Sequence, residues 1–129
     1  MSDHTIERIK EIVETITASY DKLKEFEKNS CHKEQLEKEL ITIRDTAGEI
    51  PSLLVQIFKE HPEQMQSLLS LGSMFKMSFI GTISLMIPLI KQNQNPNDEW
   101  IKTQSSMAIA LMNENGNMDA LKAILILFR

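Results

Sequence analysis

Cysteine, glycine, proline and aromatic residues are all scarce in this 129-residue sequence. The single cysteine, Cys31, excludes an intramolecular disulfide framework and is typical of a reducing, cytoplasmic setting. Four glycines and four prolines are too few for a turn-rich β protein. The few aromatic residues are not interleaved with arginine, and no basic block is present to neutralise phosphates. With a formal net charge of −4, we expect no nucleic-acid partner.

Recognisable catalytic and ligand-binding motifs are lacking as well. The sequence has no glycine-rich phosphate loop and no Gly-x-Ser-x-Gly turn. A structural zinc site needs about four ligands, but Cys31 has no second cysteine, and adjacent residues such as Cys31 and His32 do not face each other on a helix. The other histidines, His4 and His61, are far apart in the sequence. We therefore predict a protein that is not an enzyme, with no catalytic residues, no metal and no cofactor.

What is present favours one all-α domain that spans residues 1–129. The chain is too short for two independent cores, and residues that favour helices, such as leucine, lysine, glutamate and methionine, are abundant. Charge is uneven, since residues 1–46 hold 8 basic and 11 acidic side chains, whereas residues 47–129 hold 6 and 7. We predict a helical bundle with an N-terminal charged hairpin, residues 1–46, and an apolar helical body, residues 47–129.

Apolar residues within the predicted hairpin follow a heptad pattern, with steps of three and four. They are Ile6, Ile9, Val13, Ile16, Tyr20 and Leu23 in the first helix, and Leu36, Leu40 and Ile43 in the second. The stretch "EKNSCHKE" separates the two helices, with Asn29 or Ser30 expected to cap the second. Charged residues such as Glu34, Glu37 and Glu39 are expected to be solvated. The pattern predicts an antiparallel or coiled-coil-like seam, closed within one chain or between two chains.

Four further boundaries follow from proline and asparagine positions. Pro51 and Pro62 each precede helix-forming stretches and should occupy first helical turns. The stretch "NQNPND" predicts a loop, with Asn97 or Asp98 capping the helix that follows. "ENGN" predicts a second loop, with Asn117 capping "MDALKAILILF". We expect this last segment to be a helix, because a strand would lack a partner to pair with.

Residues 70–90 are the least polar part of the chain. The strictly uncharged stretch, residues 77–90, has 14 residues, whereas a spanning helix needs about 20. A longer span would enclose Lys76, and serines such as Ser70 and Ser73 add polarity. These features favour a buried central helix that starts near Pro62 and runs to Gln92 with a kink at Pro88. Five side chains could instead form a partner-binding surface, since methionine adapts to varied partners. They are Met74, Phe75, Met77, Phe79 and Met86.

These patterns lead to a functional expectation. We expect an interaction or small regulatory protein that forms a homo-oligomer and binds a protein partner through helix–helix packing. If the heptad seam closes within one chain, the apolar half becomes the interface. The alternative is a membrane-active protein that shelters residues 70–90 in a soluble form and inserts them into a bilayer.

Overall fold

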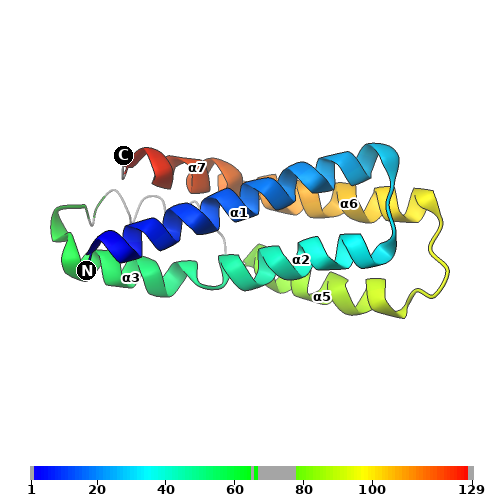
Figure 1. Ribbon diagram of the computed structural model, residues 1–129, viewed down its shortest axis with the longest axis horizontal. Helices are drawn as coiled ribbons and strands as arrows, with labels where there is room; N and C mark the ends of the chain where they lie inside the picture. The colour runs from blue at the N-terminus through cyan, green and yellow to red at the C-terminus, as the bar shows by residue number, and fades with distance from the viewer. Residues whose placement is uncertain (1, 65, 67–77, 128–129) are drawn as a thin grey trace.

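The chain folds into an all-α bundle, seen in a computed structural model that describes residues 2–64, 66 and 78–127 (Figure 1). These residues contain no β-strand. The α-helices are α1 (Ser2–Asn29), α2 (Lys33–Ala47), α3 (Ile50–Glu60), α5 (Ser78–Gln92), α6 (Asp98–Asn113) and α7 (Asn117–Leu127), with short 3-10 helices η1 (Pro62–Gln64) and η2 (Glu114–Gly116). The prediction of an all-α helical bundle is confirmed.

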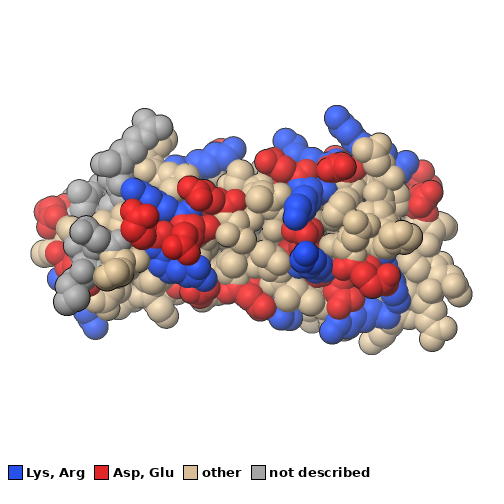
Figure 2. Space-filling view, in the orientation of Figure 1, with Lys and Arg blue, Asp and Glu red and all other residues tan. Residues whose placement is uncertain are grey.

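The long helix α1 is the element around which the others are arranged. It packs against α2 and α3 on one side and against α6 and α7 on the other. Helix α2 runs back antiparallel to α1, α5 runs in the direction of α1, and α6 returns again (Figure 1). Because α5 contacts both α2 and α6, the four helices α1, α2, α5 and α6 enclose a common core in up-down-up-down order. Acidic and basic side chains are interspersed over the face where α1 and α2 lie in front (Figure 2).

Helix α2 begins later in the sequence than a cap at Asn29 or Ser30 would place it. Helix α1 continues through Asn29, and Ser30 then adopts a left-handed backbone with φ of 64°. The Ser30 N–H donates to the carbonyl of Phe26 at 2.8 Å, which closes the end of α1. The residue that caps α2 is His32, whose backbone N–H donates to Gln35 Oε1 at 3.0 Å. The expected cap at Asn29 or Ser30 was therefore wrong.

Proline placement agrees with the sequence in α3 and only in part beyond it. Pro51 lies in the first turn of α3, where its missing N–H leaves no helical acceptor unpaired. Pro62 begins the 3-10 helix Pro62–Gln64 and not a continuous α-helix. The middle of the predicted long apolar helix, residues 67–77, lies outside the described residues. Its last part forms α5, with Pro88 inside the helix.

The boundaries of α6 and α7 are close to those expected. Asn97 precedes α6, and its side-chain oxygen accepts a hydrogen bond from the Trp100 N–H at 2.8 Å, as predicted. The first three residues of "ENGN" form the 3-10 helix Glu114–Gly116, with Gly116 at φ of 75°. Asn117 is the first residue of α7 and does not precede it. The C-terminal segment is a helix and not a strand, as predicted.

The core position expected for the apolar segment needs a correction. Ile83 and Ile90 of α5 are fully buried, but Leu85 is 71% exposed and Leu89 is 58% exposed. Helix α5 lies at the edge of the bundle, packed mainly on α2 and less on α6. The described part of the segment is thus half-buried, and the central helix of the fold is α1.

Candidate interaction surface

The predicted heptad seam lies inside the single chain. Seven of its nine side chains have no exposed surface, and they are Ile9, Val13, Ile16, Leu23, Leu36, Leu40 and Ile43. Ile6 and Tyr20 are partly buried. A second row on α1, Ile12, Ser19 and Phe26, is buried too. Its spacing of seven residues is a signal that could have been found in the sequence, and it marks a helix with neighbours on two sides.

One carboxylate is buried between α1 and α2. Glu39 is 5% exposed, although its position in a charged helix predicted solvation. Ser19 Oγ donates to Glu39 Oε1 at 2.8 Å, and Lys22 Nζ lies 3.5 Å from Glu39 Oε2. Because both carboxylate oxygens have partners, the group is satisfied where it lies. Its role is structural, since it links the two helices at one register.

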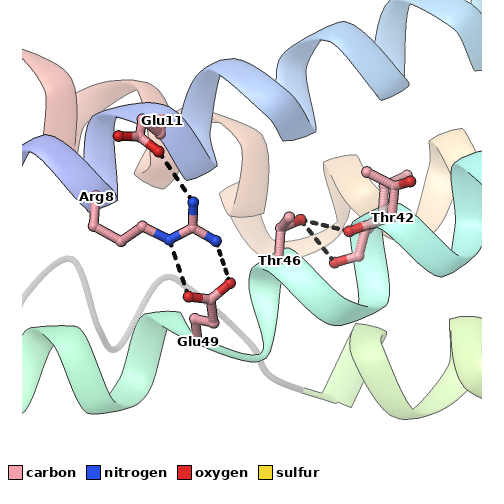
Figure 3. A network of polar contacts seen from close by, with 6 residues as sticks. Arg8, Glu11, Thr42, Thr46 and Glu49 are labelled. Atoms are coloured by element: carbon pink, nitrogen blue, oxygen red, sulfur yellow. Dashed lines mark hydrogen bonds and ion pairs between the residues drawn. The ribbon is translucent and has the colours of Figure 1, made fainter.

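A second polar network ties the α2–α3 junction to α1 (Figure 3). Arg8 Nε donates to Glu49 Oε1 at 3.0 Å, and a second guanidinium nitrogen donates to Glu49 Oε2. The remaining guanidinium nitrogen donates to Glu11 at 3.1 Å. The hydrogen bond from Arg8 lowers the pKa of Glu49, and Glu49 in turn raises the pKa of Arg8. Both side chains are about 40% exposed, with values of 41% and 43%, so water screens the pair.

Polar contacts also fix the C-terminal end of α5 against α2. Lys33 Nζ donates to the carbonyl of Lys91 at 3.1 Å and to that of Asn93 at 2.8 Å. These carbonyls lie at or just past the end of α5, where the helix leaves its acceptors unpaired. Lys91 Nζ lies 3.7 Å from Glu37 Oε1. These contacts fix which side of α5 faces the bundle, and hence which side faces away.

The cysteine and histidines do not form a reactive centre in the described part of the chain. Burial raises the pKa of the Cys31 thiol to about 11, although an N–H at Leu36 offsets part of that effect. The thiol is therefore protonated at neutral pH and is a poor nucleophile. His61 Nδ1 lies 3.2 Å from Glu63 on the surface. No group of three or more histidine, cysteine, aspartate or glutamate side chains that could hold a metal is found among the described residues.

The outer side of α5 is apolar and exposed. Leu85 and Leu89 are one helical turn apart and both project into solvent, with Gly81 and Pro88 exposed beside them. No charged residue occurs in residues 78–90 or in residues 103–113 of the neighbouring α6. We call the exposed side of α5 together with the adjoining side of α6 the α5–α6 face.

An open apolar groove lies on this face, mainly at the C-terminal half of α6. It has a volume of about 550 Å³ and is lined by Thr82, Met107, Ala110, Leu111, Asn113 and Glu114. Met107 is 49% exposed. Such a groove can accept apolar side chains, and Glu114 is the one charged side chain among its described lining residues.

Among the five side chains predicted from the sequence as a partner surface, the structure describes only that of Met86. Met86 is 4% exposed and belongs to the core. Phe79 lies in the first turn of α5. Met74, Phe75 and Met77 lie outside the described residues. The sequence signal for Leu85 and Leu89 is their position on α5, since a helical projection places them opposite the buried Ile83, Ile87 and Ile90.

Comparison with protein-family models, with curated proteins and with solved structures gives no significant match to this chain. Within the described ranges, no helix combines the length and the apolarity needed to cross a membrane.

Proposed function

We propose that this chain is a non-enzymatic helical interaction protein, which binds a protein partner by packing a helix on the α5–α6 face. The observation that carries the proposal is the exposure of Leu85 and Leu89 beside an apolar groove, on two helices that lack charge over residues 78–90 and 103–113. Exposed contiguous apolar surface is a common mark of protein interfaces.

The heptad seam supports the same assignment by elimination. Its buried members on α1 and α2 belong to the core of the single chain, so they are not free to bind another. The α1–α2 surface that remains exposed carries both signs of charge interspersed, which is typical of a solvated face (Figure 2). The apolar half is therefore the favoured place for an interface. A cytoplasmic location belongs to the same proposal, because the lone Cys31 suits a reducing compartment.

The geometry suits an amphipathic helix as the bound element. Helix-in-groove recognition places apolar anchors of the partner, spaced by three, four and seven residues, against a hydrophobic surface. Leu85 and Leu89 would be buried by such a helix, and their exposed fractions of 71% and 58% set the available gain. Complete burial of a leucine contributes about 1.5–3 kcal/mol, so these two side chains would supply about 2–4 kcal/mol. We expect binding of modest affinity.

A binding experiment with matched variants tests the proposal. The probe is a fluorescent leucine-rich amphipathic helical peptide, measured by anisotropy together with binding of an apolar dye. The double variant Leu85→Glu/Leu89→Glu should weaken peptide binding at least about tenfold. Val55→Glu is the matched control, because Val55 is 50% exposed on α3, away from the α5–α6 face. A wild-type chain that binds neither probe, or a double variant that binds as well as wild type, would refute the proposal.

A membrane-active function remains the alternative, since a bilayer can also cover an apolar helix face. Helices that lie on membranes usually carry several lysines or arginines around the apolar side, whereas α5 holds only Lys91. A protein partner is therefore favoured. Vesicle flotation and dye-leakage assays discriminate the two. Flotation of the wild-type chain that is lost in Leu85→Glu/Leu89→Glu, without peptide binding, would replace the protein partner with a lipid surface.

A further inference from the structure

The α5–α6 face carries projections and an open position on the same helix. Leu85 and Leu89 project from α5, with 71% and 58% of their surface exposed. Gly81 lies on the same side, one turn before Leu85, and a Cβ built on it would meet no atom of the described residues within 4 Å. The outer side of α5 therefore has a projecting side chain at Leu89 and an open space at Gly81, eight residues earlier and about 12 Å away along the helix axis.

This arrangement is self-complementary for two antiparallel copies. In a two-fold contact, residue i of one copy meets residue j of the other, and j meets i. If two α5 helices pack antiparallel about Leu85, each Leu89 lies opposite the partner's Gly81, and the two Leu85 side chains meet at the axis. Resting on the proposed function, we propose that the occupant of the α5–α6 face is a second copy of this chain, docked antiparallel about Leu85.

Charge favours a second copy at this face over one at the α1–α2 face. When two identical surfaces meet about a two-fold axis, like charges near the axis repel each other. The α1–α2 face would bring many charged side chains together (Figure 2). Residues 78–90 contain none, so two α5 helices meet without that penalty.

The available area predicts a weak dimer. A helix about 10–12 Å wide and about 22 Å long gives a footprint of roughly 500 Å² for two neighbouring helices. Two copies would bury roughly 1,000 Å², which is close to the lower limit for a specific interface. Association is therefore expected at micromolar concentrations and should be visible as a mass that rises with concentration.

Sedimentation equilibrium over a concentration series tests the association. Leu89→Glu should raise the dimer dissociation constant at least about 30-fold, because each dimer loses two leucine contacts. Gly81→Gln is the sharper variant. Its side chain has open space in the monomer and favours the helix, but it occupies the space that receives Leu89 in the dimer. It should weaken the dimer by a similar factor while the unfolding midpoint rises or stays constant. Val55→Glu should change the constant less than about threefold.

Cross-linking tests the orientation. In a Cys31→Ser background, Gly81→Cys and Leu89→Cys variants are mixed and oxidised. The antiparallel pairing predicts disulfides mainly between the two different variants. Disulfides mainly within each variant would indicate parallel helices and would overturn the antiparallel dimer.

The outcomes separate this inference from the proposed function. A wild-type chain that stays monomeric at about 100 μM, or a dimer unaffected by Gly81→Gln, overturns the second copy as the occupant. If the monomeric chain still binds the amphipathic peptide through Leu85 and Leu89, the proposed function stands without it. If neither association nor peptide binding is measured, both are refuted.

Discussion

The buried Glu39 carboxylate allows a quantitative test of how α1 and α2 hold their register. Ser19 Oγ donates to Glu39 Oε1 at 2.8 Å inside the interface. Lys22 Nζ lies 3.5 Å from Glu39 Oε2, and the Lys22 side chain is 54% exposed. A hydrogen bond to a charged group contributes about 1.5–3 kcal/mol, and an ion pair with an exposed lysine contributes at most about 1 kcal/mol. We therefore predict that Ser19→Ala lowers the free energy of unfolding by about 1.5–3 kcal/mol. Lys22→Met should lower it by no more than about 1 kcal/mol.

Removing the carboxylate itself should cost much less than removing its donor. Glu39→Met eliminates the buried charge and fills the space with a flexible apolar side chain, and such replacements are often neutral or stabilising. We expect a change within about 1 kcal/mol in either direction. In the Glu39→Met background, Ser19→Ala should cost at least about 1 kcal/mol less than it does in wild type, because the hydrogen bond is already absent.

Urea unfolding of the four proteins, followed by circular dichroism at pH 7, closes this double-mutant cycle. Equal dependence of the unfolding free energy on urea concentration would show that the variants unfold from comparable states. If Ser19→Ala costs as much in the Glu39→Met background as in wild type, the hydrogen bond is not the source of the loss. The account of Glu39 as a satisfied buried group would then be refuted.

Three further predictions concern single groups. Asn97→Ala should lower the free energy of unfolding by about 1 kcal/mol through loss of the α6 cap, while Asn97→Asp should lower it little. Equal unfolding free energies of the two variants in urea would contradict the role of Asn97 as a cap. Burial raises the pKa of the Cys31 thiol to about 11, so Cys31 should react with iodoacetamide at pH 8 about tenfold more slowly in the native than in the unfolded chain. The lower fraction of thiolate in the native chain outweighs the higher nucleophilicity of that thiolate. Equal rates in the two states would contradict this prediction. Arg8→Met should cost less than about 1 kcal/mol at pH 7. Because Arg8 lowers the pKa of Glu49, the ion pair stabilises the fold at pH values above the ordinary glutamate pKa, and this stabilisation is lost as pH falls through the lowered pKa of Glu49. The difference in unfolding free energy between wild type and Arg8→Met should therefore shrink by pH 3. A difference that stays constant with pH would exclude the pair as its cause.

Local hydrogen bonding explains which boundaries could be predicted from the sequence. The cap at Asn97 depends only on its own side chain and the Trp100 N–H, so the short stretch around it is sufficient. The start of α2 depends on how far α1 continues. Helix α1 extends to Asn29, and Ser30 then takes a left-handed conformation that non-glycine residues adopt rarely. That outcome is set by the packing of the whole helix, which short-range rules do not include.

Heptad periodicity identified one buried side of α1 but not the second. Ile9, Val13 and Ile16 mark a seam wide enough for one neighbour. Ile12 and Phe26 are buried as well, and Ser19 in the same row donates to Glu39 of α2, whereas Tyr20 in the seam accepts a hydrogen bond from Asn113 of α6. A periodic pattern reports that a side chain is buried, but it does not identify the covering element. The position of Glu39 has the same explanation, since a glutamate in a charged helix reads as solvated until its neighbours are known.

The exposed side of α5 follows from the same limit, and it carries the functional argument. A helix that is apolar around its whole circumference needs neighbours on both sides. Ile83, Ile87 and Ile90 are covered by the bundle, whereas Leu85 and Leu89 are not. Hydropathy has the same value whether the cover comes from the same chain or from another, which is why the sequence predicted a buried central helix. In the described part of the chain, α2 and α6 cover one side of α5 only, so about 2–4 kcal/mol of leucine burial is left for association.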